Sequence, residues 1–356
     1  MQKQKSKKME LRMASKHSLT RRECLRYLSA MGLGAAAPGL FFQPGFASPK
    51  STLQQTSRTL PLMGTMVSLT IYDSSRDKAL QAQEKALQEI QRLVPIFNRF
   101  DPQGPLGWLN KHKILKDVPP ELNLVLKQAF KLHQASQNSF DITVLPWLEE
   151  YAQHTDKTGH SPDPARNREL QQALGMDKIL LKAGTISLLH PRSKLTLDGI
   201  AKGYIVDKAA QLIQEQGIQH ALINAGGDIR VVGGKDQASP WLIGIQDPRG
   251  KKEYVQRLAL RDMAVATSGD YQRFFSPGYR HHHLLHPGQD ASPARTASCT
   301  VTAPSAMLAD SLSTALFVLP AGQGLELIQG FPKAQAHIIQ KGGRSFSSRG
   351  WSRLRA

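Results

Sequence analysis

The chain has 356 residues, of which 40% are hydrophobic and 21% are charged. This composition is typical of a globular protein and excludes a disordered or collagen-like chain. No apolar run reaches the roughly 18 residues that a membrane-spanning helix needs, which excludes a polytopic membrane protein. The two cysteines, Cys24 and Cys299, are too few for a disulfide framework.

The net charge of +18 is unevenly spread along the chain. Residues 1–47 carry nine basic and two acidic residues, and the rest of the chain is also basic. A basic body suits an anionic ligand or an anionic surface. A solvated basic surface is the alternative interpretation.

Residues 1–47 have the pattern of an export signal. Adjacent Arg21 and Arg22 precede a short apolar stretch rich in glycine and alanine at 27–42, which is typical of a twin-arginine signal peptide. A small-x-small cleavage site follows at 45–47. We therefore predict that residues 48–356 form the mature domain and that it works in a bacterial periplasm. An uncleaved amphipathic anchor is the alternative.

Hydrophobic periodicity predicts helices and strands along most of the mature chain. In chain order we expect a strand at 60–72, helices at 77–95, 121–135 and 165–174, a hairpin at 180–189, a helix at 203–216, strands at 219–224, 228–233, 241–246, 254–260 and 298–303, a helix at 305–317, and a helix followed by a strand within 323–340. Gly217 stands where a glycine ends a helix. Because strands and helices are segregated, we predict an α+β fold.

Two glycine-containing stretches have the character of anion sites. Residues 198–203 lead from an extended segment into the clearest helix, whose start offers free backbone N–H groups, and Lys202 adds a cation. Residues 224–228 place two glycines between strands, which lets a backbone approach a ligand closely. The alternatives are an ordinary helix entry with Asp198 as N-cap, and a simple β-turn.

Two further stretches carry groups suited to catalysis. Asp310 and Thr314 lie four apart on a predicted helix, so their oxygens share one face, and this pair suits Mg²⁺. A solvent-exposed face is the alternative. The three histidines at 281–283 cannot share one metal along a strand, because neighbouring side chains point to opposite faces. One of them suits the role of general base, and a surface loop is the alternative.

The order and spacing of these stretches resemble the FAD:protein FMN transferases, the ApbE family. The resemblance covers roughly residues 60–320. The matching stretches are 63–65, 97–101 with 109–110, 139–144, 198–204 with Asp207, 224–228, 266–271, 283–285 and 309–314.

The resemblance implies an ApbE-type, T-fold-like α+β fold with antiparallel sheets and packed helices. It also implies an enzyme that transfers FMN from FAD to a Thr or Ser hydroxyl of a target protein, with AMP as the leaving group and Mg²⁺ as the cofactor. Carried over residue by residue, the FAD site would contain Met63, Phe100, Ser139, Phe140, Asp141, Thr196, Asp198, Lys202, His283, Leu284 and Leu285. The metal ligands would be the Gly199 carbonyl, Asp310 and Thr314. His283 is the candidate base, and Lys202 would help Mg²⁺ to neutralise the pyrophosphate.

The sequence departs from the family pattern at several places, which include Gly104 in place of the usual Ser and the absence of the usual Arg-Thr-Gly after Pro287. Thr196 stands where the family usually has an acid, two positions before Asp198, and Leu285-His286-Pro287 replaces the usual Ile-Asp-Pro. These changes fit a specialised branch with a dedicated acceptor. They also keep two alternatives open: an FAD-binding or delivery protein without transfer activity, and a Mg²⁺-dependent FAD pyrophosphatase.

The predicted partners are FAD and an acceptor flavoprotein subunit, and no nucleic acid. A twin-arginine signal on such an enzyme resembles the NosX branch, which serves the membrane flavoprotein NosR. Periplasm-facing subunits of sodium-pumping NADH:quinone oxidoreductase or of Rnf-type complexes are the other candidate acceptors.

Overall fold

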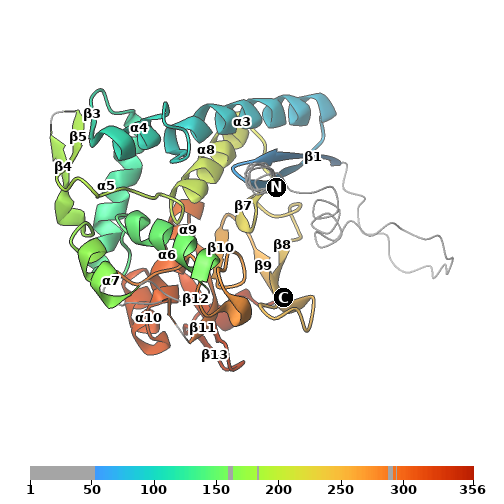
Figure 1. Ribbon diagram of the computed structural model, residues 1–356. Helices are drawn as coiled ribbons and strands as arrows, with labels where there is room; N and C mark the ends of the chain where they lie inside the picture. The colour runs from blue at the N-terminus through green and yellow to red at the C-terminus, as the bar shows by residue number, and fades with distance from the viewer. Residues whose placement is uncertain (1–52, 159–162, 183, 288–291, 294) are drawn as a thin grey trace, which may run out of the picture. The chain divides into compact units, whose positions relative to one another are not determined.

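The structure is a computed structural model that describes residues 53–158, 163–182, 184–287, 292–293 and 295–356. The predicted export signal, residues 1–47, lies outside the described residues. The strands and helices are β1 (Gln54–Leu62), β2 (Thr65–Asp73), α3 (Arg76–Phe97), α4 (Pro105–His112), β3 (Ile114–Leu115), α5 (Pro120–Ala135), α6 (Leu145–Thr158), α7 (Pro164–Gln171), β4 (Ile179–Lys182), β5 (Thr185–Leu188), α8 (Ala201–Glu215), β6 (Ala221–Ala225), β7 (Asp228–Val232), β8 (Trp241–Gln246), β9 (Tyr254–Leu260), β10 (Ala264–Gly269), β11 (Thr296–Ala303), α9 (Ala306–Val318), α10 (Ala321–Leu327), β12 (Gln335–Gln340) and β13 (Ser345–Ser347) (Figure 1).

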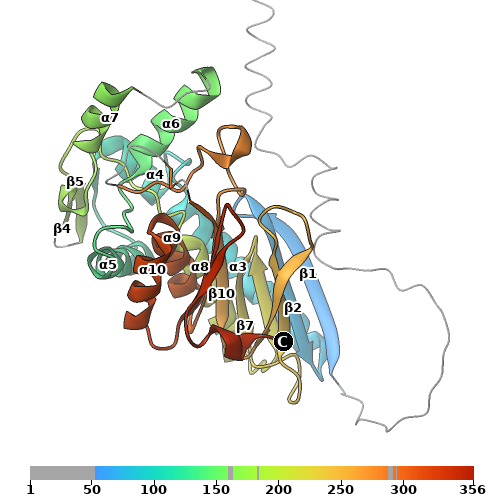
Figure 2. The same ribbon diagram turned by 90° about the horizontal axis from the view of Figure 1, so that it is seen from below.

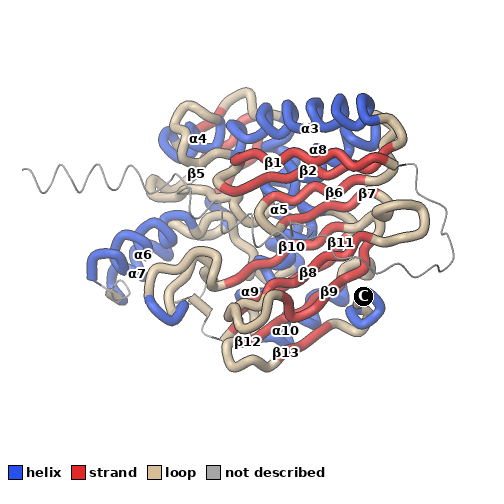
Figure 3. Tube along the Cα trace, turned by 90° about the vertical axis from the view of Figure 1, so that its right-hand side faces the viewer, coloured by secondary structure: helices blue, strands red, loops and turns tan. Residues whose placement is uncertain are grey.

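One large antiparallel sheet organises these elements. Its strand order is β1-β2-β6-β7-β10-β11-β12-β13. Helices α3, α8 and α9 cover one face, where their apolar side chains form the main core with those of the sheet (Figure 2). The two-stranded β8–β9 sheet packs on the other face around Trp241 and Trp351 (Figure 3). The predicted α+β class with antiparallel sheets is confirmed.

The strand predicted at 60–72 is confirmed as β2 over residues 65–72, but its beginning is wrong, because residues 60–62 belong to β1 of the same hairpin. Strand β1 pairs with β2 from Gln54↔Asp73 to Leu62↔Thr65. Between them Met63 and Gly64 have φ angles of 54° and 69°, and this left-handed backbone at both central positions is the geometry of a tight hairpin turn. Apolar residues on both sides of Met63 concealed the turn.

Besides β1, the sequence patterns missed the helices α4 and α6, the strand β10 and the short strands β3 and β13. Strand β10 matters most, because it pairs with both β7 and β11 in the middle of the large sheet. Its sequence, Ala-Val-Ala-Thr-Ser-Gly, has few of the bulky side chains that mark strands. The predicted helix at 165–174 is shorter in the structure and ends at Gln171. The other predicted helices and strands are confirmed within a few residues.

Helices α8 and α9 approach each other unusually closely. A Cβ atom added to Gly203 would lie 2.3 Å from the carbonyl oxygen of Ala306, so no side chain fits there. Beside this crossing, Asp207 accepts hydrogen bonds from the backbone N–H groups of Ala306 and Met307, at 2.7 and 2.9 Å. These free N–H groups at the start of α9 are thus satisfied by a side chain of α8. Among the described helices, none is both long and apolar enough to cross a membrane.

The crossing gives a stability prediction that separates packing from helix propensity. Gly203→Ala should destabilise the fold by about 2 kcal/mol or more, because the methyl group meets backbone and the helices must separate. Gly322→Ala is the matched control, since Gly322 lies in α10 with nothing within 4 Å of an added Cβ. The control should stabilise the protein by up to about 1 kcal/mol. Urea denaturation measures both, and an equal stabilisation of the two variants would contradict the close crossing.

Candidate functional site

The predicted anion site and the predicted metal pair meet at the start of α8. Lys202, in the first turn of α8, places its Nζ 3.1 Å from Oδ2 of Asp228, the first residue of β7. The two glycines before Asp228 have φ angles of 61° and 104°, which bring the β6–β7 turn back beside α8. Asp228 is buried, whereas Lys202 is partly exposed. The ammonium group therefore joins the buried carboxylate to the surface.

A second carboxylate lies in the same cluster. Asp310, on α9, is 5% exposed and its Oδ2 accepts a hydrogen bond from the backbone N–H of Gly203 at 3.1 Å. Burial and the charge of Asp228 raise the pKa of Asp310 well above its ordinary value. Burial also raises the pKa of Asp228, although Lys202 opposes the shift. Burial alone would lower the pKa of Lys202, but Asp228 and Asp310 raise it overall, so the ammonium stays charged.

Gly199 and Thr314 complete this corner of the site. A Cβ atom added to Gly199 would lie 2.8 Å from the hydroxyl oxygen of Thr314, so the Gly199 backbone packs directly against that side chain. The Thr314 hydroxyl also lies 3.3 Å from the Ser268 hydroxyl, which is 2.8 Å from that of Ser313. The three predicted metal-ligand positions are thus gathered by α9, the α8 entry and the end of β10.

These donors fit a magnesium ion better than a transition metal. No group of three or more His, Cys, Asp or Glu side chains able to hold a metal occurs among the described residues. A carboxylate, a hydroxyl and a backbone carbonyl are hard oxygen donors, and Mg²⁺ uses few of them together with water and substrate phosphates. Burial and the neighbouring Asp228 disfavour the charged form of Asp310, and a cation bound beside it would stabilise that form. Asp310, Thr314 and Gly199 are therefore the residues that would hold Mg²⁺.

His283 lies near the same cluster in a defined tautomer. Its Nδ1 is 2.9 Å from the carbonyl oxygen of Arg273, which can only accept, so Nδ1 carries the hydrogen and Nε2 is free to accept a proton. Burial lowers the pKa of His283 to about 4, while Asp198 acts in the opposite direction. The ring is thus neutral near pH 7, as a general base requires.

The other two histidines of the run face different surroundings. His281 lies with its ring centroid 5.9 Å from that of Tyr151, and His282 packs edge-on against Phe317 at 5.4 Å. Burial lowers the pKa of His282 to about 3. Of these three histidines, His283 is the one whose pKa responds to the charges of Lys202 and Asp198.

Asp198 does not cap α8, because Ile200 occupies the N-cap position. Asp198 instead forms an ion pair with Arg99, whose Nε lies 3.1 Å from Oδ2. The Arg99 guanidinium is also 4.0 Å from the ring centroid of Phe100, which is 63% exposed. The ion pair links the α3–α4 connection to the α8 entry, and the exposed ring of Phe100 lies beside it at the surface.

The 139–141 segment is joined to the α8 entry through the backbone. The N–H of Thr196 donates to the carbonyl of Ile142 at 2.8 Å. The buried hydroxyl of Ser139 has no hydrogen-bond partner among the described residues, which suits a contact with a ligand. Asp141 accepts hydrogen bonds from the backbone and the hydroxyl of Thr143, and burial raises its pKa.

Other predicted FAD contacts have side chains that pack inside the protein. Phe140 and Leu284 belong to the main core, and Leu285 to a smaller core with Trp147. Met63 is partly buried in the β1–β2 turn. At Phe140, Leu284 and Leu285, only the backbone is available to a ligand. The Thr196 hydroxyl accepts a hydrogen bond from the backbone N–H of Asp198 at 3.3 Å.

The sequence analysis did not assign Asp228, Arg99 or Ser268 to the site, although all three contact its residues in the structure. Asp228 could have been found from the sequence, because it begins a predicted buried strand after two glycines and a buried carboxylate needs a partner. Arg99 and Ser268 carry weaker signals, because their roles depend on the ion pair with Asp198 and the contact with Thr314. Both contacts are between residues far apart in the sequence.

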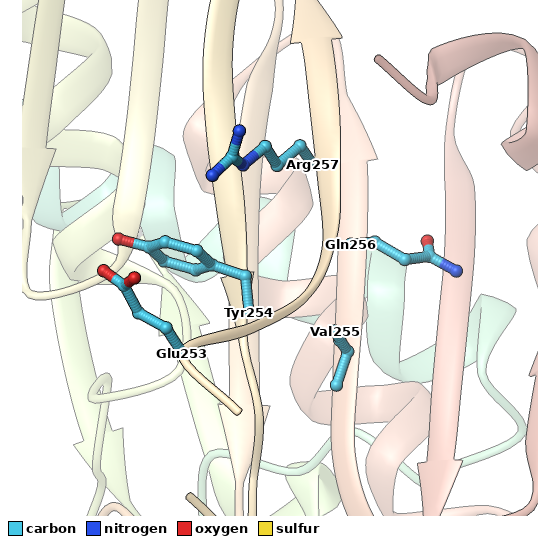
Figure 4. A pocket seen from close by; sticks show the side chains of 5 residues that line it. All are labelled: Glu253, Tyr254, Val255, Gln256 and Arg257. Atoms are coloured by element: carbon cyan, nitrogen blue, oxygen red, sulfur yellow. The ribbon is translucent and has the colours of Figure 1, made fainter. Parts of the chain in front are cut away.

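Two surface hollows lie away from this cluster. One, of about 290 Å³, is formed by residues 253–257 of the β8–β9 hairpin, with Tyr254 and Arg257 on one side of the strand and Gln256 on the other (Figure 4). The second, of about 480 Å³, is lined by residues from the end of α8, the turn after β7 and Arg261. Neither contains a predicted site residue.

The fold defines an α+β protein with antiparallel sheets, and the residue types of the charged cluster suit an anionic ligand and a hard cation. The profile of the ApbE family matches residues 63–338, and the chain belongs to this family. It is 28% identical to the FAD:protein FMN transferase of Haemophilus influenzae, over 78% of this chain and 85% of that protein. It is 31% identical to the FAD:protein FMN transferase of Escherichia coli K12, over 80% of this chain and 84% of that protein.

A solved structure supports the same relationship. The ApbE protein of Thermotoga maritima superposes with a TM-score of 0.77 at 29% identity, and the match covers 85% of this chain and all of that chain. The identification of the fold as ApbE-type is confirmed.

The ammonium at the centre of the cluster gives a second stability prediction. Lys202→Met should lower the free energy of unfolding by about 3 kcal/mol, because it leaves Asp228 buried without its partner. Asp228→Asn in the same chain should restore part of this loss, since it removes the unpaired charge. Lys208→Met, on the exposed side of α8, should change stability by less than about 0.5 kcal/mol. Urea denaturation without added metal tests all three, and equal effects of the two lysine variants would refute the buried pairing.

Proposed function

We propose that this protein is a Mg²⁺-dependent transferase that moves FMN from FAD to the hydroxyl group of a Thr or Ser on a target flavoprotein, with release of AMP. Membership of the ApbE family and the names of the relatives support the transferase class. The single observation that carries the proposal is the cluster of Lys202, Asp228 and Asp310 beside Gly199 and Thr314.

The charges of the cluster suit a pyrophosphate. Lys202 remains protonated and lies at the edge of the site, where it can pair with a phosphate oxygen. The expected free N–H groups of Ala201 and Gly203 at the start of α8 already donate to the Leu197 carbonyl and to Asp310, so the helix adds positive potential to the same region through its dipole. When bound, Mg²⁺ supplies a divalent charge that offsets the negative charge of the phosphates.

The reaction replaces one phosphorus–oxygen bond with another. The hydroxyl oxygen of the acceptor attacks the phosphorus of the FMN half, and the bond from that phosphorus to the bridging oxygen breaks. AMP leaves with the bridging oxygen and its electron pair. Nε2 of His283 accepts the proton of the hydroxyl group, because Nδ1 already donates to Arg273. Lys202 stabilises the charge that builds up on the phosphate oxygens.

The flavin and adenine ends of FAD would lie along the segments that meet at the α8 entry. Phe100 is exposed and aromatic, and such a side chain suits contact with a planar ring system. The unpartnered hydroxyl of Ser139 and the Arg99–Asp198 ion pair offer polar contacts beside it. The net basic charge of the chain helps to attract a polyanionic nucleotide.

We extend the proposal to the place of action. Export by the twin-arginine route would deliver the enzyme to the periplasm, where an acceptor of the NosR, sodium-pumping NADH:quinone oxidoreductase or Rnf type would be the target. Replacing Arg21 and Arg22 by lysines should keep the protein in the cytoplasm, which cell fractionation measures. Undiminished export of that variant would argue against this route.

Product analysis tests the proposed reaction. The chain is incubated with FAD, Mg²⁺ and an acceptor domain that carries the flavinylation threonine, and denaturing electrophoresis then shows whether the acceptor band is fluorescent. Fluorescence with release of AMP is the expected result. AMP with free FMN and no fluorescent band, with each candidate acceptor, would indicate a pyrophosphatase. Neither product despite bound FAD would indicate a flavin carrier.

The metal pair gives a prediction within the same assay. Asp310→Ala should lower the rate of transfer by at least about 100-fold while leaving much of the FAD affinity, because the carboxylate acts on the reacting phosphates more than on the rings. Ser311→Ala is the matched control, since that neighbouring hydroxyl bonds only to backbone carbonyls of its own helix. It should transfer FMN at nearly the normal rate. Normal transfer by Asp310→Ala would show that the metal assignment is wrong.

A further inference from the structure

We propose that Arg249, Asp270 and Lys341 form a clamp that positions residues 270–283, and with them His283, for the proton transfer. This inference rests on the proposed function above. The three residues come from distant parts of the chain: the loop between β8 and β9, the end of β10, and the turn between β12 and β13. None of them belongs to the predicted FAD or metal site.

The first part of the clamp holds the beginning of the 270–283 segment. Asp270 directly follows β10 and is 0% exposed. Its carboxylate accepts two hydrogen bonds from the Arg249 guanidinium, at 2.9 and 2.8 Å, and lies 3.5 Å from Nζ of Lys341. Its backbone N–H donates to Ala297. The start of the segment is therefore fixed by two cations and the neighbouring strand.

The same two cations hold the far end of the segment. Nζ of Lys341 donates to the carbonyl of Tyr279 at 2.7 Å. The guanidinium of Arg249 lies 4.7 Å from the ring centroid of Tyr279. Because each cation contacts both Asp270 and Tyr279, the clamp fastens the two parts of the segment to each other.

His283 follows the fastened part of the segment directly. Phe274 and His282 form an antiparallel bridge, and Phe275 donates to the carbonyl of His281 at 2.8 Å. Both the backbone N–H and Nδ1 of His283 bond to the carbonyl of Arg273. The orientation of the imidazole thus depends on residue 273, which the clamp holds through the rest of the segment.

The clamp is also close in the chain to the metal pair. Ser268, two residues before Asp270, contacts the Thr314 hydroxyl at 3.3 Å. The end of β10 therefore connects Ser268, which contacts the predicted metal ligand Thr314, to Asp270 of the clamp. A buried ion pair adds little net stability by comparison with apolar packing, and its best supported use is to select one arrangement of the chain. In this protein the arrangement selected is that of His283 relative to Lys202 and Asp198.

Kinetics on matched variants test the clamp. Arg249→Met should lower kcat at least tenfold while the KM for FAD changes less than about threefold, because positioning affects the transition state more than FAD binding. Arg249→Lys keeps the charge and should recover kcat to within about threefold of the wild type. Arg92→Met, which breaks the ion pairs of this α3 residue with Glu89 and with Glu121 of α5, is the control and should leave both constants unchanged. Unchanged kcat in Arg249→Met, or an equal loss in the control, would overturn the proposal.

A double variant that removes the charges of both Arg249 and Asp270 tests whether Arg249→Met acts only by weakening the pairing of the buried Asp270 carboxylate. Arg249→Met with Asp270→Asn leaves no uncompensated buried carboxylate, so the double variant should fold. It should keep the loss of kcat if the ion pair positions the segment. Recovery of the wild-type kcat in the double variant would show that the single variant failed through the buried charge alone.

NMR titration tests the clamp independently of transfer activity. Arg273, Asp198, Lys202 and His282 are the charged or titratable groups that act on His283. The pKa of its imidazole should rise by at least about one unit in Arg249→Met, because a loosened segment admits water to a buried ring. It should not move in Arg249→Lys or in Arg92→Met. A wild type without transfer activity would refute the proposed function, whereas an unmoved His283 titration in Arg249→Met would refute the clamp.

Discussion

The close crossing of α8 and α9 is the constraint on which the rest of the site depends. Gly203 lets the two helices approach until the backbone of Ala306 fills the place of a side chain. At the same residue, the backbone N–H of Gly203 reaches Asp310 on the other helix. A side chain at position 203 would separate the helices, and with them the carboxylate, the ammonium and Thr314.

This crossing explains how a small set of charges is kept in place. Asp310 comes from α9, Lys202 from α8, and Asp228 from the strand that the glycine turn brings back beside them. Two buried carboxylates and one ammonium are unfavourable alone, since burial disfavours each charge. A cation and a polyanion would stabilise the charged forms of these groups, which is the physical argument for the proposed reaction.

Sequence alone predicted the cluster better than it predicted the sheet. The helices around Lys202 and Asp310 have clear apolar periods, so their positions follow from local pattern. Strand β10 was missed because it is made of small residues, and its place in the sheet depends on pairing with β7 and β11. The turn at Met63 was missed because it depends on left-handed backbone angles, and the pairing of Arg99 with Asp198 was missed because the two residues are far apart in the sequence. Backbone handedness and long-range ion pairs leave little trace in hydrophobic periodicity.

The most direct test of the central claim is the position of the metal in crystals of the protein soaked with Mn²⁺ and FAD. Mn²⁺ takes the same oxygen ligands as Mg²⁺ and gives an anomalous signal. The account predicts one strong peak bounded by the Asp310 carboxylate, the Thr314 hydroxyl and the Gly199 carbonyl, with the FAD phosphates beside Lys202. A peak at another place, or phosphates bound away from Lys202, would contradict it.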